Sequence, residues 1–190
     1  MKKNKLAIFD LDGTLFDTKN VNFNAYNQAL LNCGFSEKID YKFYCDYCNG
    51  NNYKIFLPRI VKKISEEQLE AVHEEKKRLY KSFLGMARMN KHLFSFIKLI
   101  RDEYAVAIVT TASKTNSYEI LKEFNVTDEF DYIITQEDVG NTKPDPECYE
   151  LAIKRAELNK ADAIIFEDSE TGLKAAEASG INYVRVYGYS

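Results

Sequence analysis

The chain has 190 residues, the size of one compact domain or of a core with a small insertion. Hydrophobic residues make up 45% and charged residues 29%, which is typical of a folded globular protein and not of a disordered one. The 26 Lys and Arg against 29 Asp and Glu give a net charge of −3, which provides no basic field for binding nucleic acid or an anionic membrane. Apolar runs are far shorter than the roughly 20 residues of a spanning helix, so we expect a cytoplasmic protein.

Short apolar runs, each followed by a helical pattern, recur along most of the chain. Runs this short and this continuously apolar are typical of strands that are buried on both faces. The alternation of strands and helices predicts an α/β fold, a Rossmann-like parallel sheet with helices on both faces. The strands are expected at 6–9, 105–109, 132–135, 163–166 and 183–186. The helices are expected at 91–102, 116–124, 146–157 and 171–179, with Asp145 capping the third and Pro146 as its first helical residue.

One interval interrupts this alternation. Residues 18–89 contain no convincing β-run but have helical patterns at 22–32, 53–63 and 66–83, and Ser65 and Gln68 resemble a capping box at the start of the last one. A block of about 70 residues is enough for a small helical subdomain. We therefore predict an α-helical insertion at 18–89 in a core formed by residues 1–17 and 90–190.

Two carboxylates follow the first predicted strand at a spacing of two. Asp10 and Asp12 precede Gly13, which permits a sharp turn, and Thr14, which can hydrogen-bond an anion. Ligands of parallel α/β sheets bind outside the carboxyl ends of the strands, so both acids point into that crevice. Two close carboxylates repel unless a cation offsets their charge, and Mg²⁺ takes oxygen ligands. An acidic turn without function is the alternative reading of this motif taken by itself.

Three further motifs lie at the same predicted edge of the sheet. The second strand ends in Thr110 and Thr111 at a helix entry, where exposed N–H groups form an anion site. Lys143 lies in a loop stiffened by prolines, and the fourth strand ends in Glu167 and Asp168. Carboxylates, a hydroxyl and an ammonium are the parts of a metal-assisted phosphoryl-transfer site.

These motifs, in this order, resemble those of the haloacid dehalogenase superfamily of phosphohydrolases. Asp10-Leu-Asp12-Gly-Thr matches the first motif, Thr110-Thr111 the second, Lys143 the third, and Glu167-Asp168-Ser-Glu-Thr-Gly172 the fourth. The insertion after the first motif is similar to that of the subgroup with a helical cap, which includes β-phosphoglucomutase and phosphoglycolate phosphatase-like enzymes.

The resemblance implies a role for each matched residue. Asp10 would be the nucleophile that forms an aspartyl-phosphate, and Asp12 would protonate the leaving oxygen and then activate water. Mg²⁺ would be held by Asp10, Asp168 and the backbone carbonyl of Asp12, with Glu167 as a ligand or as a supporting acid. The phosphoryl oxygens would be bound by Thr111, Ala112 and Lys143. Thr111 is favoured over Thr110 because Thr111-Ala-Ser-Lys114 resembles a Ser-Ala-Ser-Lys stretch of β-phosphoglucomutases, but both remain open.

The resemblance leaves several functions to weigh. Phosphomutases of the β-phosphoglucomutase type carry a cap histidine and a cap arginine, and the corresponding positions here are Asn22 and about Tyr53, so hydrolysis of a small phosphorylated metabolite is favoured. A haloacid dehalogenase proper is disfavoured, because its chemistry needs no metal, whereas Asp12 and Asp168 indicate a metal site. A non-catalytic binding module is disfavoured, because every catalytic residue type is present. We expect a monomer or a weak dimer.

The insertion contains two further candidate features. Its polar, aromatic stretch around Asn51, Tyr53 and Lys54 is expected to contact the substrate, with a wet helix junction as the alternative. Cys45 and Cys48 have the spacing of half a zinc site or of a redox pair. Two further zinc ligands are missing, so buried thiols acting as small hydrophobes are the favoured interpretation.

Overall fold

The computed structural model describes residues 3–187 and divides the chain into two compact units. One unit includes the chain up to Asp17 and from Arg88 onward, and the other is Thr18–Ala87. The first unit contains all the strands of the described chain, and the second contains only helices.

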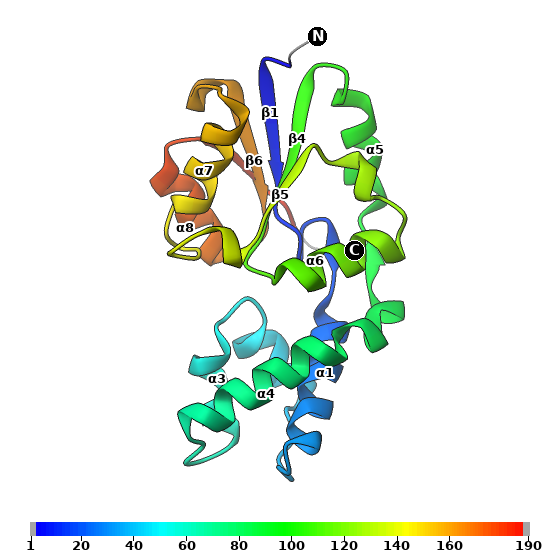
Figure 1. Ribbon diagram of the computed structural model, residues 1–190, viewed down its shortest axis with the longest axis vertical. Coiled ribbons are helices and arrows are strands. Elements are labelled where there is room, and N and C mark those ends of the chain that lie inside the picture. Colours follow the sequence, from blue (N-terminus) through cyan, green and yellow to red (C-terminus); the bar gives the residue numbers. More distant parts are fainter. Residues whose placement is uncertain (1–2, 188–190) are drawn as a thin grey trace. The chain divides into compact units, whose positions relative to one another are not determined.

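The first unit is built on a five-stranded parallel sheet, as the sequence predicts (Figure 1). The strand order is β5-β4-β1-β6-β7, and every neighbouring pair is parallel. The strands are β1 (Lys5–Phe9), β4 (Tyr104–Val109), β5 (Tyr132–Ile134), β6 (Ala163–Glu167) and β7 (Asn182–Arg185). The central strand β1 is fully buried from Leu6 to Phe9, which explains its continuously apolar sequence.

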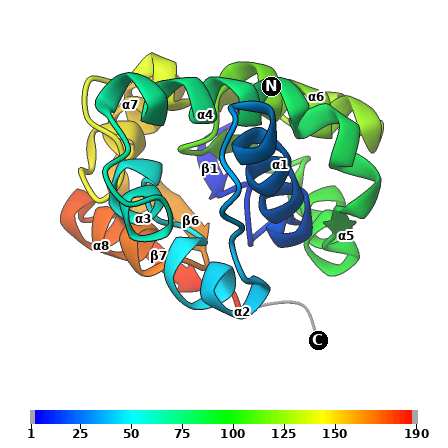
Figure 2. The ribbon, with the colours of Figure 1, turned by 90° about the horizontal axis from the view of Figure 1, so that it is seen from below.

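Helices cover both faces of this sheet. Helices α5 (Lys91–Ile100) and α6 (Lys114–Glu123) lie on one face, and α7 (Glu147–Ala156) and α8 (Glu170–Ser179) on the other (Figures 1 and 2). Short 3₁₀ turns join them: η3 (Thr127–Glu129), η4 (Gln136–Asp138) and η5 (Lys160–Asp162). Strands β4 and β5 lie on one side of β1, and β6 and β7 lie on the other. The carboxyl ends of β1, β4 and β6 therefore border the switch point, where α/β sheets bind ligands.

Two details of the first unit differ from the sequence expectation. Helix α7 begins at Glu147, so Pro146 is the cap, and Asp145 binds the Glu147 N–H through its carboxylate at 3.0 Å. A two-stranded antiparallel ribbon, β2 (Phe16–Asp17) and β3 (Arg88–Met89), was not predicted. Strands of two residues are too short to show a periodic pattern, and the ion pair between Arg88 and Asp17 at 2.6 Å joins residues far apart in sequence.

The second unit is a helical block with its own apolar core. Its elements are α1 (Lys19–Asn32), α2 (Tyr41–Phe43), the π-helix η1 (Tyr44–Cys48), α3 (Tyr53–Ile60), α4 (Glu66–Leu79) and the 3₁₀ helix η2 (Tyr80–Met86). The capping box of Ser65 and Gln68 is present at the start of α4. Cys48 lies in the apolar core of this unit, and burial raises its pKa to about 11, which favours an inert thiol.

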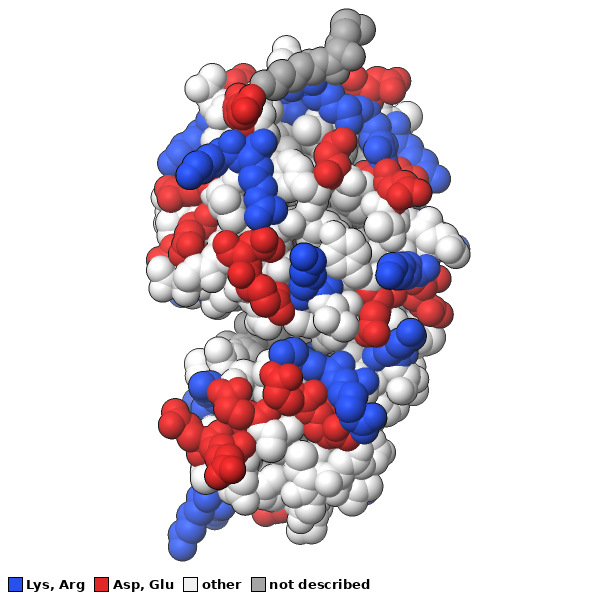
Figure 3. All heavy atoms as spheres, viewed as in Figure 1, with Lys and Arg blue, Asp and Glu red and all other residues white. Residues whose placement is uncertain are grey.

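The surface and the helix lengths bear on the classes of partner. On the face shown in Figure 3, Lys and Arg are interspersed with Asp and Glu and do not form one basic patch. Of the helices between residues 3 and 187, none combines the length and the apolar character needed to cross a membrane.

Candidate active site

Lys143 connects two carboxylates at the carboxyl ends of β1 and β6. Its Nζ lies 2.7 Å from Asp10 Oδ1, 2.6 Å from Glu167 Oε2 and 3.1 Å from the carbonyl oxygen of Val109, the last residue of β4. Its side chain is only 3% exposed. A buried ammonium with three hydrogen-bond acceptors differs from a solvated loop lysine. The fold therefore holds Lys143 in a defined position beside Asp10.

Glu167 accepts hydrogen bonds on both carboxylate oxygens. Oε1 accepts from the Asp168 N–H at 3.2 Å, the Ser169 N–H at 3.0 Å and the Ser169 hydroxyl at 2.9 Å. Oε2 accepts from Lys143 and from the Tyr149 hydroxyl at 2.8 Å. A carboxylate has about four lone-pair positions. Five donors therefore leave little room for a metal ligand bond, although Glu167 lies close to the other acids.

Asp168 lies against the turn that follows β1. Its Oδ1 accepts from the Thr14 hydroxyl at 3.0 Å. A Cβ atom at Gly13 would lie 2.2 Å from Asp168 Oδ2, and Gly13 also has a φ of +99°. Both the contact and the backbone conformation require glycine at this position. The Asp-Gly-Thr sequence thus brings the first motif and the fourth motif into contact.

The charges of this cluster are unbalanced. Burial, together with the charge of Glu167, raises the pKa of Asp10 well above its ordinary value and that of Asp168 to about 6. Burial acts in the same direction on Glu167, but Lys143 and the hydrogen bonds outweigh it and lower the pKa of Glu167. Burial opposes the charged form of Lys143, yet Asp10 and Glu167 raise its pKa well above the ordinary value. One ammonium thus faces three carboxyl groups.

A divalent cation fits this donor set. Carboxylate oxygens of Asp10, Glu167 and Asp168 lie within 4.8 Å of one another. Oxygen ligands with excess negative charge are those that Mg²⁺ prefers. Because Glu167 is already occupied by five donors, Asp10 and Asp168 are the acids best placed to hold a metal. Asp12, two residues beyond Asp10, is partly buried in the same turn.

The two threonines of the second motif, which follow β4, have different environments. Thr110 is buried, its N–H continues the ladder to the Ile134 carbonyl at 3.0 Å, and its hydroxyl accepts from the Ala112 N–H at 3.0 Å. Thr111 is exposed and lies beyond the ladder. The geometry therefore favours Thr111 as the hydroxyl that can meet an anion, while the Ala112 N–H has an intramolecular acceptor.

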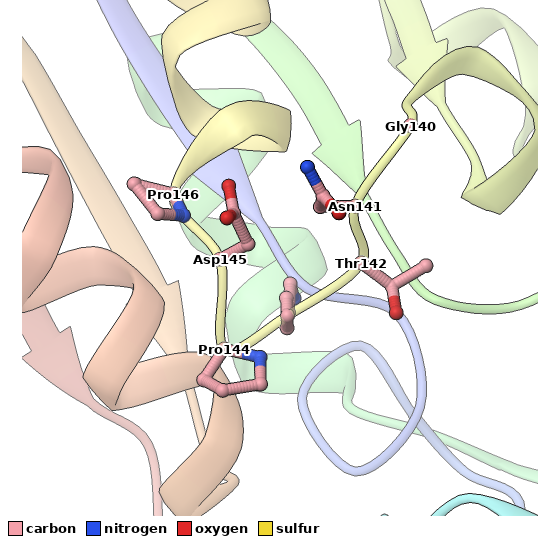
Figure 4. Close-up of a pocket in the computed structure, with 7 residues that line it drawn as sticks. Gly140, Asn141, Thr142, Pro144, Asp145 and Pro146 are labelled. Atoms are coloured by element: carbon pink, nitrogen blue, oxygen red, sulfur yellow. The ribbon is translucent and has the colours of Figure 1, made fainter.

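The loop that carries Lys143 is closed by a side chain of α7. Glu147 accepts from the Gly140 N–H and the Asn141 N–H, each at 2.8 Å, on its two carboxylate oxygens. Figure 4 shows this loop passing through Gly140, Asn141 and Thr142 to Pro144, Asp145 and Pro146 at the start of α7, along a surface pocket that the same residues line. Glu147 therefore fixes the segment that precedes Lys143.

The three candidate residues of the helical unit lie at the start of α3. The Tyr53 hydroxyl donates to Glu70 Oε2 at 2.7 Å, and Lys54 Nζ forms an ion pair with Glu70 Oε1 at 2.7 Å. Asn51 donates to the Tyr47 carbonyl at 3.1 Å. Tyr53 and Lys54 thus share one acceptor on α4 within this unit.

Tyr149 is the supporting residue of the site that sequence reasoning did not identify. Tyr149, Ser169 and the Thr14 hydroxyl each bind a carboxylate of the cluster. Thr14 is expected from the sequence to hydrogen-bond an anion, and Ser169 follows the acid pair as a candidate helix cap and does cap α8. Tyr149 has no such signal, because its spacing in α7 is that of an ordinary core aromatic residue.

The comparisons with known proteins agree with this architecture. The model of the family "Haloacid dehalogenase-like hydrolase" matches residues 7–186. The chain is 31% identical over 185 residues to the phosphorylated carbohydrates phosphatase of Thermotoga maritima, covering 96% of this chain and 83% of that protein. It is 27% identical to the beta-phosphoglucomutase of Bacillus subtilis, covering 96% and 83%.

A solved structure supports the fold. The crystal structure of CbbY from Rhodobacter sphaeroides in complex with phosphate has a TM-score of 0.86 at 22% identity, covering 98% of this chain and 87% of that one. The family model covers nearly the whole chain, including the strand ends that carry Asp10, Lys143, Glu167 and Asp168. The chain belongs to the haloacid dehalogenase-like hydrolase family.

Proposed function

We propose that this protein is a Mg²⁺-dependent phosphatase that hydrolyses a small organic phosphomonoester through an aspartyl-phosphate on Asp10. The observation that carries the proposal is the buried contact of Lys143 with Asp10 and Glu167, next to Asp168, at the carboxyl ends of adjacent strands. Relatives named phosphorylated carbohydrates phosphatase and fructose-1-phosphate phosphatase support a phosphomonoester substrate.

In the proposed reaction, Asp10 attacks phosphorus and the bond from phosphorus to the leaving oxygen breaks. Asp12 gives its proton to that oxygen, and the alcohol departs. Asp12 then takes a proton from water, which attacks the phosphoryl group and regenerates the Asp10 carboxylate with release of phosphate. Lys143 and the Thr111 hydroxyl bind phosphoryl oxygens, because phosphoryl transfer depends on positioning and charge stabilisation more than on covalent chemistry.

Asp10, the Asp12 backbone carbonyl and Asp168 would hold the metal, and Glu167 would support Lys143. The bound cation would neutralise charge on the phosphoryl oxygens and on the acids. Asp10 must be ionised to act as a nucleophile, whereas burial and its acidic neighbours raise its pKa. Added positive charge lowers the pKa of a neighbouring carboxyl, so the donor set and the proposed role of Asp10 agree.

A phosphomutase is the second candidate, because one relative is named beta-phosphoglucomutase. The position of the phosphomutase histidine is occupied by Asn22, whose amide donates to the Thr18 carbonyl and hydroxyl at 3.3 and 3.2 Å. The side-chain amide of asparagine does not ionise near neutral pH, so it cannot replace the titrating imidazole of the phosphomutases. This difference favours hydrolysis over transfer to a second substrate hydroxyl.

The test is release of inorganic phosphate from p-nitrophenyl phosphate and from a panel of sugar, polyol, amino-alcohol and nucleotide monophosphates. Release should require Mg²⁺, stop in EDTA, and fall by about three orders of magnitude or more in Asp10→Asn. Circular dichroism of Asp10→Asn checks that the fold is retained. Full turnover in chelator, or near-normal turnover of Asp10→Asn, would contradict the proposal. Interconversion of sugar phosphate isomers faster than phosphate release would favour the phosphomutase.

A further inference from the structure

Tyr149 contacts two members of the site but has no role in the chemistry proposed above. It lies on α7, is fully buried, and donates its hydroxyl to Glu167 Oε2 at 2.8 Å. The centroid of its ring is 5.1 Å from Lys143 Nζ. The hydroxyl and the ring thus bind two different charged groups, a carboxylate and an ammonium.

The Tyr149 hydroxyl and the Lys143 ammonium donate to the same oxygen. Lys143 has three N–H donors and three acceptors, namely Glu167 Oε2 at 2.6 Å, Asp10 Oδ1 at 2.7 Å and the Val109 carbonyl at 3.1 Å. A second donor on Oε2 offsets part of its negative charge and weakens its attraction for the ammonium. The ammonium is then shared more evenly with Asp10.

We infer that the Tyr149 hydroxyl is a positioning group that acts through Glu167 to keep Lys143 shared between Glu167 and Asp10. The inference rests on the proposed phosphatase function. Without the hydroxyl, Glu167 Oε2 draws Lys143 toward itself and away from Asp10. Lys143 then stabilises less of the charge that develops on the phosphoryl oxygens, so kcat should fall while KM changes less.

Tyr149→Phe isolates the hydroxyl, because phenylalanine keeps the ring, its packing and its contact with the ammonium. The matched control is Tyr132→Phe, which removes a hydroxyl that donates to the Ala152 carbonyl of the same helix at 2.8 Å. Tyr149→Phe should lower kcat about tenfold with KM within about twofold of wild type, as expected for loss of a hydrogen bond to a charged group. Tyr132→Phe should retain the wild-type kcat. Thermal melting of both variants measures the purely structural effect.

A double-mutant cycle with Glu167→Gln tests the route of the effect. A neutral amide does not pull on the ammonium, so Tyr149→Phe should lower kcat little further in the Glu167→Gln background. Equal kcat values for Tyr149→Phe, Tyr132→Phe and wild type would overturn the inference, as would a full additional loss in the Glu167→Gln background. Should Glu167→Gln not fold, the comparison of the two tyrosine variants decides. A wild-type protein without metal-dependent phosphatase activity would overturn the proposed function, and this inference with it.

Discussion

At the scale of single residues, the site is a cluster of acids that one ammonium does not neutralise. Lys143 lies between Asp10 and Glu167, and the hydrogen bonds around Glu167 keep that carboxyl ionised. Asp10 and Asp168 have raised pKa values because burial and the neighbouring acid disfavour their charged forms. Glu167 therefore serves as the ionised partner of Lys143, whereas Asp10 and Asp168 need a further cation to stabilise their charged forms.

Asp168 should stabilise the metal-free protein when the pH falls from 7 to about 5. The pKa of Asp168 is about 6 in the fold against 3.8 as its ordinary value, so this carboxyl binds more protons in the folded state than in the unfolded state in this interval. His73 acts in the opposite direction, because burial lowers its pKa to about 4, so the effect of Asp168 is measured against Asp168→Asn. Between pH 7 and pH 5 in EDTA, the melting midpoint of the wild type should gain about 4 °C relative to that of the variant.

Addition of Mg²⁺ at pH 7 should also raise the midpoint, because a ligand of the folded state stabilises it by mass action. Asp168→Asn serves as the control, because it removes the contribution of this carboxyl to the pH dependence and should reduce the Mg²⁺ effect. The same change of midpoint between pH 7 and pH 5 in the wild type and in Asp168→Asn, with no response of the wild type to Mg²⁺, would contradict this account of the acids.

At the scale of elements, the acids of the cluster lie at the ends of β1 and β6, and Lys143 lies in the loop that precedes α7. The strands could be predicted because β1, β4 and β6 are buried and apolar, and a chemical group follows each of them at the switch point. The hydrogen bonds that Glu167 accepts from Asp168 and Ser169 are local, whereas those from Tyr149 and Lys143 could not be predicted, because they join segments 18 and 24 residues apart in sequence. The ribbon of β2 and β3 was missed for a related reason, because two-residue strands have no periodicity.

Glu147→Gln should lower kcat/KM about tenfold for every substrate, because it disturbs the loop that carries Lys143. Each oxygen of Glu147 accepts from one backbone N–H, of Gly140 and of Asn141, and a glutamine replaces one acceptor by a donor. Glu150→Gln on the same helix is the matched control, because the Glu150 carboxylate forms a long surface ion pair with Lys160, at 3.6 Å, instead of holding the loop. Steady-state kinetics of both variants provide the comparison, and equal kcat/KM values would show that the loop does not depend on Glu147.

At the scale of the whole molecule, chemistry and recognition are assigned to different units. In the proposed function, Asp10, Asp12, Lys143 and Asp168 of the α/β unit meet the phosphoryl group common to all substrates. We propose that the start of α3, with Asn51, Tyr53 and Lys54, recognises the leaving group. Its polar and aromatic side chains suit a hydroxylated or amino-bearing metabolite.

Lys54→Ala and Tyr53→Ala should change the order of kcat/KM values among the substrates of the panel, with a loss of about tenfold for the best metabolite. They should change p-nitrophenyl phosphate turnover little, because this compound offers few groups to recognise. Glu70→Gln is the control, since it weakens the contacts of both side chains with α4 and leaves both in place. An unchanged ranking in both alanine variants would remove this stretch as the specificity element.

The covalent role of Asp10 is the central claim, and a burst experiment tests it most directly. In Asp12→Asn the group that activates water is absent, whereas p-nitrophenolate is a good leaving group and needs no proton from Asp12. Mixing this variant with Mg²⁺ and p-nitrophenyl phosphate should release about one p-nitrophenolate per site rapidly and then continue slowly. Mass spectrometry of the acid-quenched protein should find a phosphoryl group on Asp10. Release without a burst, or a phosphoryl group on another residue, would contradict the account.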